Sequence, residues 1–548
     1  MGSGVSSLLD ISKRSLFNQS QAIRVIGNNI ANVNTEGYSR RKVDIKSSDS
    51  FDTGEGTSFG TGADIDSVYR TVDKFINLAY QGRIGDRARS EARDEFLARL
   101  EPMFALDGST KTISSELSGF FSAIEDLAQN PSDVSLRRNV LDQGQNLATT
   151  INRVYSQVSQ LQREADDRIN YLVEEVNRIG GQIANLNSQI SGKEDGSQEL
   201  LTARDQREQL VRDLSEIMSV TTVENSDGST LVTIGNGFAL VSGIHSNALE
   251  TSKSPSFAPV GGYPKGLDGD ALSFIVHDFD TGAGTSHADF TGTIAAGGGE
   301  LGGLLSLRGV QSATDTTAFD AVGDFVTAAS MVEAIAEDLL TRFNLSYLGP
   351  DENGGTAFHN PSSGDLAGST PASPYSLFNF TGAADLDADG RPDDLAGLRT
   401  ALTIPSFAEI IQFGVTSEQQ LAAALDLDPA AGSLSFTTGD SRNLDNLAAL
   451  RQQKVAYSVG NFNQTSSLEE VYDTLTSTVG SLRATSKNQF ALDKDRETMA
   501  KELYSSTSGV SLDEEFANLI TFQKAYEASA RLVRVGDEML TEVIGLLG

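Results

Sequence analysis

The chain has 548 residues, no Cys, no Trp and a formal net charge of −33 at pH 7. This length is several times that of a usual domain, so we expect several domains. The absence of Cys excludes disulfides, thiolate catalysis and Cys-ligated metals. The negative charge argues against nucleic acid and anionic membranes as partners, because both are bound through basic patches.

The start of the chain, MGSGVSSLLDISKRSLF, lacks a basic segment ahead of an apolar one, so we expect no cleaved secretory signal. No run of about 18 apolar residues predicts a membrane span. These features indicate a soluble, acidic, multidomain chain that is either cytosolic or exported without cleavage of a signal.

The first predicted element is a helix. Apolar residues recur at spacings of three and four between residues 5 and 33, which places them on one helix face. The segment ANVNTEGYSRR, residues 31–41, follows directly. Its Asn and Gly residues tolerate the left-handed backbone that ends helices, and its Thr and Ser favour turns, so it is predicted to end the helix.

A second, longer stripe of apolar residues recurs between Ile151 and Ile190 and predicts a long packed helix. Short segments rich in β-branched residues then lie at 221–223, 230–234 and 238–241, separated by Asp-Gly and Asn-Gly turns, which predicts a β-meander. A helical return is expected near 301–345. A loop-rich insertion follows up to about residue 438.

The last predicted element is a helix whose apolar stripe begins at Leu512 and continues to the last residues. Such a helix must pack against something if it is ordered. The N-terminal helix, another subunit or both are the expected neighbours. Apolar residues on its other faces, such as Ile520, Phe522 and Leu532, favour contacts between subunits.

The predicted fold class is multidomain α+β. A rod-like helical base, formed by a coiled coil of the terminal helices and an α-helical core domain, is expected to carry β-rich inserted domains that project outward. The expected segments, in chain order, are the N-terminal axial helix and connector (1–50), the first part of the α-helical core domain (51–219), a β-rich inserted domain (220–300), a helical return to the core (301–345), a second loop- and β-rich insertion (346–438), the last part of the core domain (439–507) and the C-terminal axial helix (508–548).

Catalytic motifs are absent: the sequence has no HExxH, GxSxG, GxxxxGK[ST] or GxGxxG motif in the required setting. The four His residues form no metal-binding pair at helical spacing. We therefore predict no enzyme activity and no cofactor. One stretch, DLDADGRPDD, resembles a Ca²⁺ loop, although Ala396 stands where such a loop has its bidentate Glu. An acidic solvated turn is the alternative to a Ca²⁺ site formed by Asp385, Asp387, Asp389 and Asp393.

Four stretches carry a resemblance to a known family. NNIANVNTEGYSR (28–40) and SGVSLDEEFANLITFQKAYEASARL (508–532) are similar to the terminal motifs of bacterial flagellar axial proteins. LLTARDQREQLVRDLSEIMSV (200–220) and GELGGLLSLRG (299–309) resemble internal segments of the hook-associated protein 1 (FlgK) family. Ser511 stands where that family commonly has Asn, and it is expected to form a capping box with Glu514.

The resemblance implies a structural protein of the bacterial flagellum, a junction or adaptor between hook and filament that filament assembly requires. It implies export through the flagellar type III apparatus without a cleaved signal, and an extracellular location. The implied partners are other copies in a ring of about eleven, the hook protein, the next junction protein toward the filament, and an export chaperone on the C-terminal helix. Nucleic acid and membrane are not expected partners.

Subunit packing is the expected role of the terminal segments. The residues predicted to carry it are Ile23, Ile26, Ile30, Asn32, Asn34, Gly37, Tyr38, Arg40, Leu512, Phe516, Leu519, Phe522, Tyr526 and Leu532. Arg40 and Arg41 are expected to meet carboxylates of the next copy.

Two alternatives remain open from the sequence. The chain could be another axial protein, a flagellin or an elongated hook or rod protein, although the Asn-Gly-Tyr motif opposes the first and the internal matches oppose the second. It could also be a secreted protein whose 346–438 insertion carries a binding or hydrolase activity. That insertion holds one His, His359, and no HExxH.

Overall fold

The computed structural model describes most of the chain. The described residues are 2–49, 51–52, 58–104, 111–193, 197–235, 237–253, 267, 272–280, 285–311, 321–348, 377–380, 406–418, 421, 439–459 and 462–547.

The chain divides into two compact units. Unit 1 contains Met1–Ala88, Glu175–Ala248 and Ala491–Gly548, and unit 2 contains Arg89–Glu174 and Leu249–Phe490. Three long helices run through both: α2 (Lys74–Leu100), α4 (Val134–Ile190) and α13 (Leu468–Ser508).

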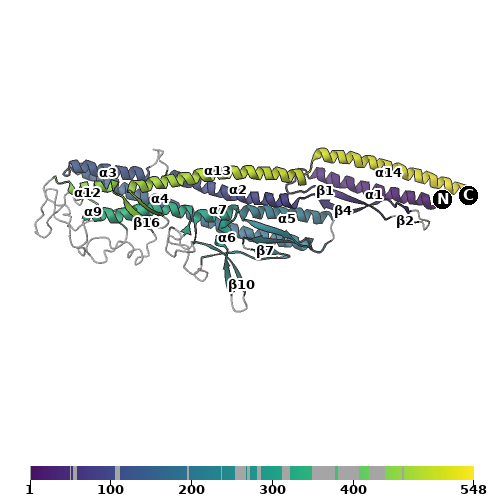
Figure 1. The fold of residues 1–548 in the computed structure, drawn as a ribbon, viewed down its shortest axis with the longest axis horizontal. Helices are drawn as coiled ribbons and strands as arrows, with labels where there is room; N and C mark the ends of the chain where they lie inside the picture. Colours follow the sequence, from purple (N-terminus) through teal and green to yellow (C-terminus); the bar gives the residue numbers. More distant parts are fainter. Residues whose placement is uncertain are drawn as a thin grey trace. The chain divides into compact units, whose positions relative to one another are not determined.

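The two ends of the chain form a helix pair in unit 1. Helix α1 (Gly2–Ala31) lies beside α14 (Leu512–Leu547), as Figure 1 shows. The Ser15 and Ser529 hydroxyls are 2.7 Å apart. A Cβ at Gly536 would lie 2.8 Å from Leu9 Cδ2, so a larger residue there would force Leu9 to move. The packing of the terminal helices against each other is therefore as expected.

The face of α14 that contacts α1 is only partly the predicted one. The more buried positions follow the spacing of a helix face, but several are small or polar: Glu515, Leu519, Phe522, Ala525, Ser529, Val533, Gly536 and Leu540. Leu512 and Phe516, which begin the predicted stripe, are exposed. The predicted stripe therefore divides between the face toward α1 and the surface.

The capping box expected at the start of α14 is not formed. The Glu514 carboxylate pairs with Arg40 instead of reaching back to the backbone of Ser511. An ion pair with a guanidinium replaces the expected bond because Arg40 lies beside this first turn.

Two sets of strands complete unit 1 with helix α5 (Gln198–Ile217). The antiparallel pair β1 (Arg41–Ser47) and β4 (Ala63–Arg70) follows α1, with the short pair β2 (Phe51–Asp52) and β3 (Ser58–Phe59) between them. This hairpin was not among the expected elements. The four-stranded meander has the order β5-β6-β7-β8. Its strands are Val220–Glu224, Thr230–Ile234, Phe238–Ser242 and His245–Ser246, which confirms the predicted meander.

The long central stripe forms as predicted. Its residues from Ile151 to Ile183 are at most 2% exposed on α4, as is Ile190, while Leu186 is half-buried. A single helix therefore buries one face along most of its length.

Beside its parts of the long helices, unit 2 contains shorter helices. They are α3 (Ile113–Gln129), α6 (Thr291–Ala296), α7 (Gly299–Arg308), α8 (Asp324–Asp338), α9 (Asn344–Leu348), α11 (Phe407–Ile410) and α12 (Arg442–Ala449), with 3-10 turns at Glu101–Met103 and Leu450–Gln452 and a π-helical turn at Leu339–Phe343. The predicted helical return is present as α7, α8 and α9, with a strand pair between α7 and α8.

The strands of unit 2 are short and antiparallel. They are β9 (Glu250–Ser252), β10 (Phe274–Asp280) and β11 (Thr285–Asp289) in one sheet, and the pairs β12 (Val310–Gln311) with β13 (Ala321–Val322), β14 (Phe378–Phe380) with β15 (Ile411–Phe413), and β16 (Val455–Val459) with β17 (Phe462–Ser466). Phe378 of β14 packs edge-on against Phe120 and Phe343. This described part of the second insertion is therefore held to the helical core by aromatic contacts.

Candidate functional site

The turn after α1 is held by its own side chains. The Asn32 Nδ2 donates to Asn28 O at 2.9 Å, and the Thr35 hydroxyl donates to Asn32 Oδ1 at 3.1 Å. Gly37 has φ of 78°, the left-handed backbone that favours Gly. These contacts confirm that the Asn-Gly segment ends the helix.

Asn29, which is fully buried, fastens the segment after the turn. Its Nδ2 donates to Arg41 O at 2.9 Å and to Glu515 Oε2 at 3.0 Å. Its Oδ1 accepts from Arg41 N–H at 3.1 Å and from the Tyr38 hydroxyl at 2.9 Å. An amide side chain can donate two hydrogen bonds and accept two, so all the hydrogen-bonding capacity of Asn29 is used.

Arg40 joins the connector, residues 32–41 after α1, to the start of α14. Its Nε lies 2.7 Å from Glu515 Oε1, and its Nη1 pairs with Glu514. The Arg40 side chain is 10% exposed and that of Glu515 is 2% exposed. The Arg40 N–H also donates to Ser508 O at 2.8 Å. A buried carboxylate needs such a partner, because removing a charge from water is costly.

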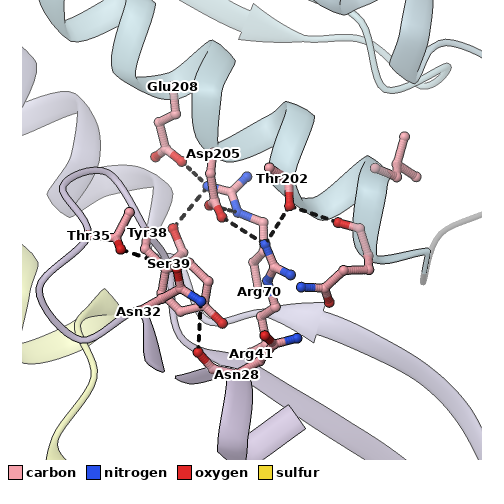
Figure 2. Close-up of polar contacts among 12 residues, drawn as sticks. Asn28, Asn32, Thr35, Tyr38, Ser39, Arg41, Arg70, Thr202, Asp205 and Glu208 are labelled. Atoms are coloured by element: carbon pink, nitrogen blue, oxygen red, sulfur yellow. Dashed lines mark hydrogen bonds and ion pairs between the residues drawn. The ribbon is translucent and has the colours of Figure 1, made fainter. Parts of the chain in front are cut away.

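Arg41 and Arg70 attach the connector to α5, as Figure 2 shows. Arg41 Nη2 lies 3.0 Å from Thr202 Oγ1 and 3.3 Å from Asp205 Oδ2. Arg70 Nε lies 2.7 Å from Asp205 Oδ1, and its Nη2 pairs with Glu208. Asp205 therefore bridges two guanidinium groups, those of Arg41 and Arg70, which are paired across the open end of the β1–β4 hairpin.

Tyr38 packs inside this network, with the Arg41 guanidinium 4.9 Å from the centre of its ring. The pKa of Tyr38 is raised to about 12, mainly by burial; Asp205 and Glu515 also raise it, while the Arg41 charge opposes them. Burial on its own would lower the pKa of Arg70, but Glu208 and Asp205 outweigh it and the pKa is raised. Arg70 is thus held charged and the tyrosine neutral.

The arrangement is suited to fixing segments in position. It joins α1, α14, the hairpin and α5 through charged hydrogen bonds, which are stronger than neutral ones. A cavity of about 800 Å³ lies beside it, with walls that include Tyr38 and Thr35 of the connector and Gln182, Gln206 and Gln209 of α4 and α5. Such amide groups can bind the polar backbone of another chain segment.

The predicted site residues divide into three groups in the structure. Arg40 and Ile26 are buried; Ile23, Ile30, Asn32, Gly37, Tyr38, Leu519 and Phe522 are half-buried; and Asn34, Leu512, Phe516, Tyr526 and Leu532 are exposed. The expectation that Arg40 and Arg41 meet carboxylates of another copy is corrected, because carboxylates of the same chain occupy both.

Sequence reasoning missed the partners of these residues: Asn29, Arg70, Asp205, Glu208 and Glu515. Asn29 and Glu515 do lie inside the two terminal motifs, which was a usable signal. Asp205 and Glu208 also lie inside a quoted stretch, 200–220, but nothing indicated that they are buried partners, because charges on an amphipathic helix are usually solvated.

The proposed Ca²⁺ ligands Asp385, Asp387, Asp389 and Asp393 lie outside the described residues, as does His359. Among the residues that are described, no group of three or more His, Asp or Glu side chains could hold a metal ion. In the same part of the chain, no helix is long and apolar enough to cross a membrane.

Comparison with known proteins finds similarity to flagellar proteins along the chain. The model described as the flagellar hook-associated protein FlgK helical domain matches residues 97–357. Models of the flagellar basal body rod FlgEFG protein C-terminal region and of the flagella basal body rod protein match residues 502–546 and 9–38. Flagellar hook-associated protein 1 of Escherichia coli (strain K12) is 25% identical over 99% of this chain and 100% of that protein. The chain is similar to FlgK proteins over essentially its whole length.

Other FlgK relatives agree. Flagellar hook-associated protein 1 of Bacillus subtilis (strain 168) is 26% identical over 98% of both chains. The solved structure of the flagellar hook junction protein FlgK from Burkholderia pseudomallei is 16% identical, with a TM-score of 0.52 over 78% of this chain and 99% of that one. This last similarity concerns the fold, a helical core with β-rich parts. FlgK proteins are structural flagellar proteins.

The first prediction concerns Arg40. Arg40→Ala leaves the Glu515 carboxylate buried without its guanidinium, which should cost about 3–5 kcal/mol. Hydrogen exchange measured by mass spectrometry should then be faster in the first turns of α14. Arg14→Ala, which removes an exposed ion pair with Asp64, is the control and should cost about 0–1 kcal/mol. Unchanged exchange in the Arg40 variant would show that the pair does not hold α14.

The second prediction concerns pH and Tyr38. Because the pKa of Tyr38 is about 12 when folded and 10.0 in its ordinary state, its contribution to stability is complete below pH 10 and is lost as the pH rises through 12. Tyr38→Phe also loses the bond to Asn29, worth about 1 kcal/mol at neutral pH. The stability advantage of the natural protein over this variant, measured by urea unfolding, should shrink between pH 10 and 12. Tyr526→Phe, at an exposed site, should show no such change.

Proposed function

We propose that this chain is a structural component of the bacterial flagellum that joins the hook to the filament and is needed for filament assembly. The observation that carries the proposal is the match over essentially the whole chain to proteins named flagellar hook-associated protein 1. The paired terminal helices support it, because a helix pair with apolar residues on its outer faces is suited to packing among further copies.

Exposed apolar side chains follow α14 along its length. They are Leu512, Phe516, Ile520, Tyr526, Leu532, Val535, Met539 and Ile544, and Phe17 is exposed on α1. Soluble chains rarely leave such a continuous series uncovered. Covering it would contribute about 25 cal/mol for each Å² of apolar surface removed from water. Contact with other copies, in a ring of about eleven, with the hook protein and with the next junction protein would bury this surface.

The connector supplies the positional precision that this role requires. The terminal helices would pack between subunits through Ile23, Ile26, Ile30 and the apolar α14 residues, while Asn32, Asn34 and Gly37 shape the turn. Arg40 and Arg41 then fix the helices to α5 within each copy. Force carried by the helix pair would pass into the remainder of the subunit through these buried ion pairs.

Delivery to the flagellum would occur through the flagellar type III apparatus, without a cleaved signal. An export chaperone would bind the C-terminal helix. Tyr526 and Leu532 are exposed and accessible to it, whereas Leu519 and Phe522 face α1. A chaperone that contacts the latter pair must therefore take the place of α1.

Deletion of the gene tests the proposed function. Cells lacking this chain should build hooks, fail to build filaments and lose flagellin to the medium, as seen by electron microscopy and by blotting of the culture fluid. A plasmid copy of the natural chain should restore filaments. Normal filaments in the deletion strain would refute the proposal.

Removal of residues 508–548 tests the chaperone interaction. The truncated chain should no longer retain the chaperone in a pull-down from the flagellated cell. Phe75→Ala, which removes an exposed aromatic side chain elsewhere, should leave the interaction intact. Undiminished binding by the truncated chain would place the chaperone site outside α14.

A further inference from the structure

A basic pocket of about 360 Å³ lies at the start of α2, between that helix, β4, α5 and the meander. Its lining includes the cations Arg70, Lys74, Arg204 and Arg207 and the carboxylates Glu208 and Glu224. Four cations against two carboxylates make this a positive site in a chain whose net charge is −33. A negatively charged partner would be attracted to it.

Neighbouring groups of the same chain hold the cations of the pocket in position. Arg207 donates to Asn187 Oδ1 at 3.0 Å and to Gly228 O at 2.7 Å, and Lys74 lies 2.8 Å from Glu224. The pKa of Arg207 is lowered to about 10, mainly by burial and also by the charges of Arg204 and Arg70, against the opposing effect of Glu224. An added carboxylate near this group would relieve the repulsion between the guanidinium groups.

Apolar side chains surround the mouth of the pocket. Tyr69 and Leu78 belong to its lining and are exposed. Phe75, next to Lys74, is 85% exposed. A partner that fits this surface must present apolar side chains together with carboxylates.

The first turns of α14 present this combination. Leu512, Phe516 and Ile520 recur every four residues and are exposed, so they share one face of the helix. Asp513 is exposed at the edge of that face. Recognition of an amphipathic helix by an apolar surface with a charge at its base is a common mode of protein binding.

The two surfaces are linked through the backbone of Arg40, but the pocket does not bind its own α14. The Arg40 N–H donates to Ser508 O just before α14, and the Arg40 O accepts from Thr71 N–H just after β4; both distances are 2.8 Å. The described lining of the pocket contains no residue of α14. Copies arranged side by side at one level would therefore bring the α14 face of one near the pocket of the next.

We propose that the Leu512–Ile520 face of α14 in one copy packs over the basic pocket and Phe75 of a second copy. This inference rests on the proposed function, because it requires copies arranged in a ring. The two surfaces differ, so the contact is heterologous and continues from copy to copy until the ring closes. Phe516 would pack against Phe75, and Asp513 would approach Lys74.

Cysteine cross-linking tests this contact, since the natural chain has no Cys. A deletion strain would carry Phe75→Cys and Phe516→Cys in one chain, and isolated flagella would be treated with a short bismaleimide. We expect a ladder of dimers, trimers and larger species on a denaturing gel, and only monomers from either single variant. Phe516→Cys with Met499→Cys, at another exposed site, is the matched control and should give monomers.

Several outcomes would overturn the contact. If cells that carry the double variant build filaments but yield only monomers after cross-linking, the contact is refuted and the proposed junction role stands. An equal ladder from the Met499 control, or dimers from one single variant, would also refute it. Normal filaments in the uncomplemented deletion strain would instead refute the proposed function.

A charge exchange tests the electrostatic part within the same cross-linked chain. Lys74→Glu or Asp513→Lys alone should reduce the ladder, and the two together should restore it. Both positions are exposed, so the changes should cost the subunit little, although Lys74→Glu also removes the surface ion pair with Glu224. No recovery in the combined variant would contradict the pairing of these two residues.

Discussion

The pairing of Arg40 with Glu515 is the interaction on which the arrangement of the terminal helices depends. Both side chains are almost fully buried, and each charge is tolerable only because the other is present. Asn29 binds the second oxygen of the same carboxylate and also the backbone of Arg41. The end of α1, the connector and the start of α14 are therefore fixed to one another at a single point, and the two helices run together from there.

The sequence predicted the buried face of a helix correctly where that face is apolar and misassigned it in part where it is not. On α4 the stripe from Ile151 to Ile190 is both periodic and buried, so the pattern identified the helix and its core face. On α14 the face toward α1 includes Glu515, Ser529 and Gly536, which have no hydrophobic signal. Small residues are needed there because the helices approach closely, so the visible apolar stripe marked partly the wrong face.

In the candidate site, the sequence predicted polar contacts between nearby residues but not those between distant ones. The turn at Asn32–Gly37 was predictable because its bonds are local, between residues three or four positions apart. Asp205 could not be found in this way, since 164 residues separate it from Arg41. Only the fold brings them together. The motif at the end of α1 therefore indicated where a site lies but not what completes it, and it led to the assumption that the missing carboxylates belonged to another copy.

Charge sets a further constraint on a chain of this kind. Residues 220–440 contain 28 Asp and Glu and 6 Lys and Arg, so copies that gather in one structure must repel one another over distance. Such repulsion keeps separate chains soluble, but it opposes assembly unless favourable contacts act at short range, where buried apolar surface and paired charges outweigh it. A positive pocket with an apolar mouth is a local exception to the acidic surface. A contact there, between two different surfaces, would join copies in one order only, which a ring requires and a symmetric dimer contact cannot provide.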